Sequence, residues 1–377
     1  MAESTTRRSV NILWGALAVA ALLLVALRIA NRPTTSVRGP LKILTPPFTA
    51  NKAELIQKLR DRKFQDLDAQ LNSYQKAFEK DPLEEGNLSI AFEAFNFTDP
   101  SLSPILDEWV KSEPGSYPAH VARAKYLIAL GWQARGDQNG DKTSDQQLSE
   151  MQAHFVEGVK EAVAAIKLNP QASIAYASII DAAKGVSDYK TIKGAYGASL
   201  KNVPLSLSTR AVTILALRPR WGGSYDAMDK FADAAQKCAA QNPRLESLKG
   251  FADVDRGDIA SSAGNQKQAV DYCNRALAEG GDFASAYLQR GTAYDALHRY
   301  DEALEDLSRA NRLRPQEPHT LEILAYVYAH LNRPKDTLAT IQEYQQFAVL
   351  PADLVSLQQW AQNFGGGTQQ AVKTGGD

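Results

Sequence analysis

The sequence predicts an all-α protein, a helical-hairpin solenoid behind one N-terminal transmembrane helix. Three observations lead to this prediction. Apolar residues recur every three or four positions through most of the chain, its C-terminal part repeats with a fixed period, and no useful stretch alternates apolar and polar residues as a strand would. A single helical pair cannot bury its apolar face alone, so we expect the pairs to stack into one continuous core.

The composition suits a helical body with a sizeable core and argues against nucleic acid as a partner. Hydrophobic residues make up 44% of the 377 residues, and 42 Lys and Arg stand against 43 Asp and Glu. Residues 1–40 carry five arginines and one acid, so the remainder has 37 bases and 42 acids. A face that binds nucleic acid needs a basic stripe, and this mildly acidic body carries none in its sequence.

A short tail, residues 1–11, precedes an apolar segment, residues 12–30, that predicts a transmembrane signal anchor. Residues 12–27 carry no charge, which is at the short end for a spanning helix, and the stem of Arg28 can extend the span toward Ala30. The alternative is a cleaved signal peptide, but Arg28 stands where cleavage needs a small residue. We therefore expect an uncleaved single-pass anchor, with the membrane as a partner.

These features predict a protein of the bacterial cytoplasmic membrane and leave its orientation open. Positive charges after the anchor outnumber Arg7 and Arg8 before it, which by a simple count keeps the body in the cytoplasm. Long domains, however, translocate largely regardless of charge, and a tail with two adjacent arginines resists crossing. The second argument favours a periplasmic body.

Residues 31–51 predict a Pro-rich tether, and residues 52–245 predict an irregular domain of helical pairs. From Phe64 to Pro82 the apolar side chains follow three- and four-residue steps, and Tyr117–Gly136 and His154–Pro170 repeat this pattern. We expect each of these stretches to form one helix that packs on its neighbours.

The C-terminal part carries a repeat with a period of 34 residues. Gly257, Gly291 and Ala325 follow one another at this step. Further positions do the same: Ala269, Ala303 and Thr337; Cys273, Leu307 and Ile341; and, in two copies, Ala276 and Ala310. Small residues at these places let the two helices of a pair approach closely.

This pattern, clearest from Ala284 to Pro315, resembles the tetratricopeptide repeat, and the resemblance covers residues 250–348. It implies antiparallel helix pairs stacked into a right-handed superhelix with a concave groove. We place the repeats at residues 246–348, a capping helix at residues 349–364 and a disordered Gly-rich tail at residues 365–377.

The resemblance also implies a peptide groove, lined by fixed positions on the first helix of each repeat. In the second and third repeats these positions are Leu288, Thr292, Asp295, His319, Glu322, Tyr326 and His330; in the first they are Phe251, Val254, Asp258, Ser261 and Ser262. Family members that capture a peptide carboxylate use Lys and Asn there, and this chain has neither at these positions. The alternative is that the protein's own preceding helices fill the groove.

Three motifs of the body resemble an uncharacterised bacterial family, the domain of unknown function 4034. They read DPLEEGNLSIAFEAF, LDEWVKSEPGSYPAHVARAKYLIALGWQARG and RPRWGGSYDAM. The resemblance covers roughly residues 55–245. The family has no assigned activity, so it implies a helical, repeat-like body and no particular chemistry.

The last of these motifs is the candidate site with the most chemical character, and it has two interpretations. Arg218, Arg220 and Trp221 could hold a small anionic ligand beside the start of the next helix. Alternatively, Gly222 and Gly223 make a structural corner, with Trp221 as its apolar plug and Arg218 or Arg220 lying over the indole. After this corner we expect one unbroken helix, from Ser224 to Gln241.

No arrangement of residues in the sequence predicts catalysis, a metal site or a cofactor. The acidic pairs Glu84–Glu85 and Asp107–Glu108 are adjacent, so on a helix they diverge, and Cys238 and Cys273 form no metal or redox motif. We expect a non-enzymatic scaffold that binds another protein or a peptide segment at the cell envelope. The alternative is a ligand sensor or enzyme centred on the Trp221 corner.

Overall fold

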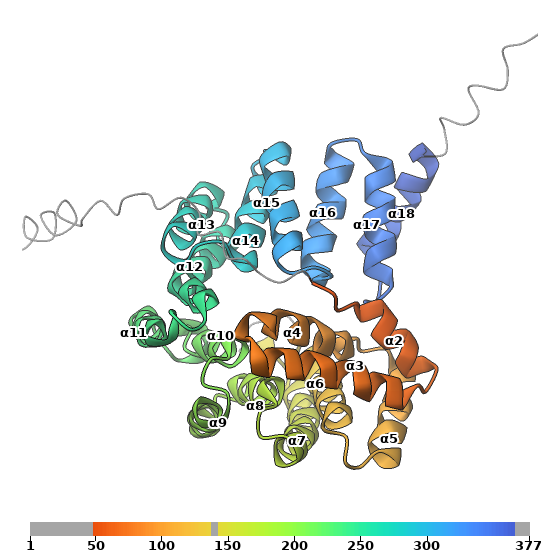
Figure 1. The fold of residues 1–377 in the computed structure, drawn as a ribbon. Coiled ribbons are helices and arrows are strands. Elements are labelled where there is room, and N and C mark those ends of the chain that lie inside the picture. Colours follow the sequence, from red (N-terminus) through yellow and green to blue (C-terminus); the bar gives the residue numbers. More distant parts are fainter. Residues whose placement is uncertain (1–47, 137–141, 366–377) are drawn as a thin grey trace, which may run out of the picture. The chain divides into compact units, whose positions relative to one another are not determined.

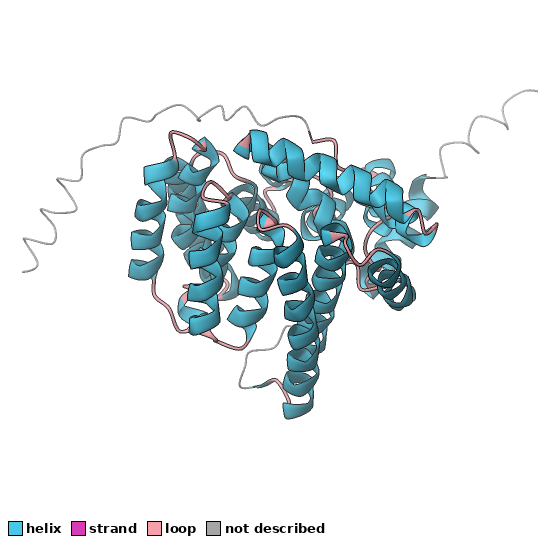
Figure 2. Ribbon diagram, turned by 60° about the horizontal axis from the view of Figure 1, so that its bottom comes forward, coloured by secondary structure: helices cyan, strands magenta, loops and turns pink. Residues whose placement is uncertain are grey.

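The computed structural model describes residues 48–136 and 142–365, and all regular secondary structure in these ranges is helical (Figures 1 and 2). The tail at 1–11, the expected membrane segment at 12–30 and the C-terminal residues 366–377 lie outside the described ranges. No described helix combines the length and the apolar character that crossing a membrane requires.

The helices fall into two consecutive groups along the chain. The first group is α2 (Lys52–Arg60), α3 (Phe64–Lys80), α4 (Glu85–Glu93), α5 (Ser103–Ser112), α6 (Tyr117–Arg135), α7 (Asp145–Leu168), α8 (Ser173–Gly185), α9 (Tyr189–Asn202), α10 (Leu207–Ala216) and α11 (Tyr225–Ala235). The second is α12 (Phe251–Ser262), α13 (Gln266–Gly280), α14 (Ala284–Ala296), α15 (Tyr300–Leu313), α16 (Pro318–His330), α17 (Pro334–Gln345) and α18 (Ala352–Gly365).

Local signals in the sequence set several of the helix starts. The hydroxyl of Ser116 accepts a hydrogen bond from the backbone N–H of Ala119 and so caps α6. Ser144 and Gln147 form a reciprocal capping box at the start of α7. Ser206 begins α10 in the same way. Each cap satisfies a backbone donor that has no partner within its helix.

The 34-residue repeat appears in the backbone as three similar turns. The turns α12–α13, α14–α15 and α16–α17 each have one residue with positive φ: Gly264 (80°), His298 (58°) and Asn332 (53°). The N–H of the following residue donates to a carbonyl five positions earlier, at 2.8–2.9 Å in all three turns. This bond is typical of a helix that ends in a left-handed residue. The second group is therefore a true array of helical hairpins.

Small residues allow the two helices of each repeat to approach closely. A Cβ placed on Gly291 would lie 2.8 Å from Cγ of Leu307, and one on Gly257 would lie 3.2 Å from Sγ of Cys273. Ala303, which follows the same period, is fully buried. The repeat helices pack in chain order, as Figure 1 shows for α12 to α17.

The prediction of one unbroken helix from Ser224 to Gln241 is wrong. α11 ends at Ala235, and a short 3-10 turn follows at Gln236–Cys238. A second 3-10 segment begins at Pro243. Because the residue before a proline avoids helical geometry, Asn242 has an extended backbone and the chain changes direction there.

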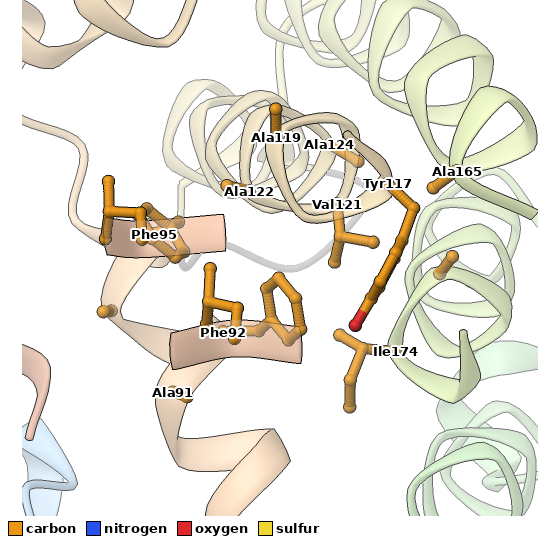
Figure 3. Close-up of a cluster of buried hydrophobic side chains, with 14 of the residues drawn as sticks. Ala91, Phe92, Phe95, Tyr117, Ala119, Val121, Ala122, Ala124, Ala165 and Ile174 are labelled. Atoms are coloured by element: carbon orange, nitrogen blue, oxygen red, sulfur yellow. The ribbon is translucent and has the colours of Figure 1, made fainter. Parts of the chain in front are cut away.

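The largest apolar core joins the helices of the first group. In Figure 3, Phe92 of α4 faces Val121 of α6, and the ring of Tyr117 extends toward Ile174 of α8. These side chains are at least nine-tenths buried. The packing fixes α4, α6 and α8 beside one another, and each of these helices contributes to the cavity described below.

Polar contacts also join the start of the described chain to its third repeat. Lys52 donates from its ammonium to the backbone oxygen of Gln316 at 2.7 Å and from its backbone N–H to that residue's Oε1 at 2.8 Å. The ammonium also lies 3.1 Å from a carboxylate oxygen of Glu93, and Arg314 binds the other oxygen at 2.8 Å. Glu93 thus bridges α2 and the end of α15.

The close approach at Gly291 leads to a stability prediction. Gly291→Ala should destabilise the protein by about 1–3 kcal/mol, because the new methyl group would press on Leu307 and on Cβ of Asp306. The matched control is Gly197→Ala in α9, where no neighbouring atom lies within 4 Å of the added carbon. This control should be neutral or stabilising by up to about 1 kcal/mol. Denaturant unfolding followed by circular dichroism measures both, and equal effects would contradict the packing argument.

Candidate binding cavity and groove

A cavity of about 460 Å³ lies among the helices α4, α6, α8, α10, α12, α14 and α15. Its apolar lining includes Phe48, Ile174, Val212, Leu215, Phe251 and Phe283. Charged side chains also line it, namely Glu85, Glu93, Lys125, Asp181, Arg218, Arg244, Asp282, Arg309 and Arg314. Its volume is in the range of small-molecule sites, which combine apolar walls with a few polar groups.

Two carboxylates of this lining are strongly held by cations. Burial alone would raise the pKa of Glu93, but Arg314, Lys52 and Lys125 outweigh it and lower that pKa to about 2. Burial would likewise raise the pKa of Asp181, yet its net pKa is lowered by Lys184, whose Nζ lies 2.6 Å away. Both side chains are therefore anions at neutral pH.

Lys125 lies near both carboxylates but forms no direct ion pair with either. Its pKa is lowered, first by burial and then by the positive charges of Arg314 and Lys52, while Asp181 and Glu93 act in the opposite direction. Within the described residues its ammonium has no carboxylate within 4.0 Å, unlike Lys52 and Lys184. Among the lining cations Lys125 shares this lack of a direct ion pair with Arg244, whose guanidinium donates to the backbone oxygen of Leu83 at 3.2 Å.

Glu85 has a structural role at the cavity wall. Its carboxylate accepts hydrogen bonds from the hydroxyl of Ser206 and from the backbone N–H of Leu207, both at 2.5 Å. It therefore occupies the start of α10, where the helix dipole favours negative charge. The pKa of Glu85 is raised, because burial outweighs the hydrogen bonds and the charge of Arg244 that act to lower it.

At the predicted corner, the two arginines bind carboxylates instead of covering the tryptophan. Nε of Arg218 lies 3.1 Å and Nη2 of Arg220 lies 2.9 Å from Oδ1 of Asp255, which is fully buried. Arg220 also binds Asp258 at 2.7 Å, and the hydroxyl of Tyr225 donates to Asp255 at 3.1 Å. Arg218 lines the cavity, whereas Arg220 and Trp221 do not.

The prediction that Arg218 or Arg220 lies over Trp221 is wrong. The indole of Trp221 is half-buried and meets that of Trp132 edge-on, with ring centroids 5.9 Å apart. Arg135 lies 5.5 Å and Lys184 lies 5.8 Å from the centre of the Trp221 ring. The cations come from α6 and α8, because the corner packs on the ends of these two helices.

Backbone geometry explains the two glycines of the corner. Gly222 has a φ of 84°, a left-handed conformation that favours glycine. A Cβ on Gly223 would lie 2.0 Å from the backbone oxygen of Leu217, so a side chain does not fit there. Ser224 then caps α11 by accepting the N–H of Ala227.

The groove residues of the second and third repeats are exposed or partly exposed, and their polar groups are paired with one another, with the backbone or with α18. None of the seven is buried. Nδ1 of His330 lies 3.0 Å from a carboxylate oxygen of Asp295, and the hydroxyl of Tyr326 donates to Asp353 of α18 at 2.5 Å. His319 lies 3.3 Å from Glu322, and the hydroxyl of Thr292 donates to the backbone oxygen of Leu288. In the first repeat, by contrast, Phe251 and Val254 line the cavity.

Sequence reasoning missed Lys52, Glu93, Lys125, Asp181 and Arg314. A signal was present for three of them, because each is a lone charge in an apolar run. These runs are IAFEAF around Glu93, AKYLIAL after Lys125 and SIIDAA around Asp181. A charge on the apolar stripe of a helix needs a buried partner, and so it indicates a polar interior.

The two cysteines lie within the described residues and do not pair with each other. Cys238 and Cys273 are free thiols, and burial raises the pKa of Cys273 to about 12. Within the described ranges, no three His, Cys, Asp or Glu side chains gather in a way that would hold a metal ion.

Part of the chain matches a known family model. Residues 51–189 match the family model described as Domain of unknown function (DUF4034). The predicted resemblance to this family is therefore confirmed over these residues, and α9 to α11 lie almost wholly outside the match. No curated protein matches the chain.

Among solved structures, the chain is similar to tetratricopeptide-repeat proteins. Cut9 in the Cut9–Hcn1 hetero-tetramer of the APC/C is 15% identical, with a TM-score of 0.33; the match covers 79% of this chain and 52% of that one. Yeast Tom70 is 12% identical, with a TM-score of 0.28 and coverage of 86% and 96%. A monomeric IFIT1 mutant with Gppp-AAAA is 10% identical, with a TM-score of 0.31 and coverage of 85% and 73%. Because these TM-scores are below 0.5, the repeat assignment depends on the helix pairs of this chain.

The contacts of Trp221 lead to a second prediction. Trp221→Ala should destabilise the protein by about 1–3 kcal/mol, less than a fully buried tryptophan would, because the indole is only half-buried against Trp132. Trp221→Phe keeps an aromatic ring in the corner and should lose less than half as much. Thermal unfolding measures both variants. An alanine variant as stable as the wild type would show that the ring is not a structural plug.

Proposed function

We propose that this protein is a membrane-anchored, non-enzymatic scaffold whose helical repeats bind another protein or a peptide segment at the bacterial cell envelope. The observation that carries the proposal is the inner face of α14 and α16. It belongs to regular helical hairpins, and none of the seven residues on it is buried by the protein's own helices. This exposure supports the proposed peptide groove.

The chemistry of this face suits a segment with mixed polar and apolar side chains. Leu288 and Tyr326 offer apolar surface, and His319 and His330 are exposed imidazoles. The pairing of His330 with Asp295 and of Tyr326 with Asp353 holds their side chains in defined positions. A preorganised surface loses less side-chain entropy when a partner binds.

A site-specific crosslink tests the groove. With a photoreactive amino acid at Thr292, we expect a defined adduct to one partner in intact cells. The control position is Val156, which is 48% exposed on the surface of α7. Leu288→Arg, which adds a charge to the groove, should reduce the Thr292 adduct at least about tenfold. The same adducts at both positions, or no effect of Leu288→Arg, would exclude the groove as the binding surface.

A second experiment tests the anchor and the orientation. Removal of residues 12–30 should move the protein from the carbonate-washed membrane fraction to the supernatant, because this segment supplies the apolar span. In spheroplasts that contain the intact protein, added protease should digest the body. Digestion only after lysis would place the body in the cytoplasm. Retention of the deletion variant in the membrane fraction would contradict the prediction that residues 12–30 are the anchor.

A second candidate function, the sensing of a small ligand, is supported by a different observation, the cavity. Arg218 links it to the original corner hypothesis, since this side chain lines the cavity. Arg220 and Trp221 take no part in the lining. If the protein binds a small ligand, we therefore expect it in the cavity between the helices and not at the Trp221 corner.

A further inference from the structure

Glu93, Lys125, Asp181 and Arg314 line one side of the cavity, and these groups together with their charged neighbours do not balance. Lys52, Lys125, Lys184 and Arg314 are four cations that act on the two carboxylates of Glu93 and Asp181. Glu317 also acts on Arg314 while it caps α16, and even with this third carboxylate one positive charge remains. Lys52 and Glu93 are largely shielded from water, whereas the side chain of Arg314 is half exposed. Charges shielded from water are costly unless they are paired, so the cluster has room for one more anion.

Lys125 is the residue where that anion belongs. The other three cations already hold a carboxylate at 2.6–3.1 Å. In the sequence, Lys125 lies between Glu93 and Asp181. Both carboxylates act on the pKa of Lys125, and neither forms a direct ion pair with it. An anionic group at its ammonium would relieve the repulsion from Arg314 and Lys52 that the structure otherwise leaves in place.

Beside this charged group, apolar side chains form one part of the cavity wall, while Glu85, Arg218, Arg244, Asp282 and Arg309 line other parts. The inner face of α10 contributes Ala211, Val212 and Leu215, and α8 contributes Ile174 and Ala177. Phe251 and Phe283 stack with their ring planes 8° apart, and both line the same space. These apolar side chains favour a hydrocarbon body along α8 and α10.

From this arrangement we propose that the cavity binds a small amphipathic organic anion, with its carboxylate or phosphate head group at Lys125 and its hydrocarbon part along α8 and α10. This site is separate from the peptide groove, because none of the seven groove residues lines the cavity. The proposal goes beyond the scaffold function and does not depend on it.

Simpler ligands satisfy only half of the site. An inorganic anion would neutralise Lys125 but leave the apolar walls unfilled, and a neutral hydrocarbon would fill the walls but leave the positive charge. A ligand with both parts buries apolar surface and forms a charge-assisted hydrogen bond at the same time. The requirement for both parts makes the proposal testable with matched probes.

The test measures binding of octanoate and octyl phosphate to the full chain in lipid nanodiscs by isothermal titration calorimetry. We expect at least one of them to bind, and the better of the two identifies the head group. Lys125→Met should weaken that binding about tenfold or more, since it removes the ammonium and keeps a side chain of similar length. Lys125→Arg, which keeps the charge, should restore part of it.

The controls separate specific binding from partition into the lipid. Lys167→Met removes an exposed lysine near the end of α7 and should bind as the wild type does. Octanol and inorganic phosphate should bind at least tenfold more weakly than the amphipathic anion. Equal binding by Lys125→Met, by octanol or by inorganic phosphate overturns the proposal, and so does the absence of binding by both probes. Circular dichroism of each variant excludes loss of the fold as the cause.

Discussion

The arrangement of the two helix groups depends on the ion pairs of the Glu93 carboxylate. Lys52, at the start of the described chain, binds one of its oxygens, and Arg314, from the second repeat, binds the other. The contact partners of Lys52 include Gln316, 264 residues away in the sequence. Removing the Glu93 carboxylate would leave the ammonium of Lys52, which is 3% exposed, as an uncompensated buried charge, and this typically costs about 3–5 kcal/mol. The cluster therefore holds α2, α4 and the end of α15 in one arrangement, and α4 and α15 of this arrangement line the cavity.

The same constraint explains why the inner faces of α4, α6 and α8 carry charge at all. A purely structural interior would be better filled with apolar side chains, since replacing buried ion pairs by packed hydrophobic residues is often neutral or stabilising. Here Glu93, Lys125 and Asp181 each interrupt an apolar run, and their neighbours Phe92 and Ile180 are almost fully buried. Charges at such positions, with one cation in excess, are the basis for the ligand proposed for the space that Glu93, Lys125 and Asp181 line.

The sequence predicted those features of the fold that depend on residues close together in the chain. The helix pairs of the 34-residue repeat, the close approach at Gly291 and the corner at Gly222 and Gly223 all follow from residues close together in the chain. The failures concern contacts between distant segments. Arg135 and Lys184 lie near Trp221, and Asp255 takes Arg218 and Arg220, because the stacking of successive helices determines which faces meet. No periodicity in the sequence encodes how successive helices stack. Lone charges in apolar runs do, however, indicate a polar interior.

The two proposed surfaces share a structural element, and this has a thermodynamic consequence. α14 contributes Ala284 and Ser285 to the cavity and Thr292 and Asp295 to the groove, so both sites depend on the position of one helix. α15, which packs against α14, brings Arg309 and Arg314 to the cavity. A ligand that fixes these helices reduces the entropy left for a groove partner to remove, and binding at the two sites is then reciprocally favourable. The buried charge cluster is where such a ligand would act, because it already joins the two helix groups.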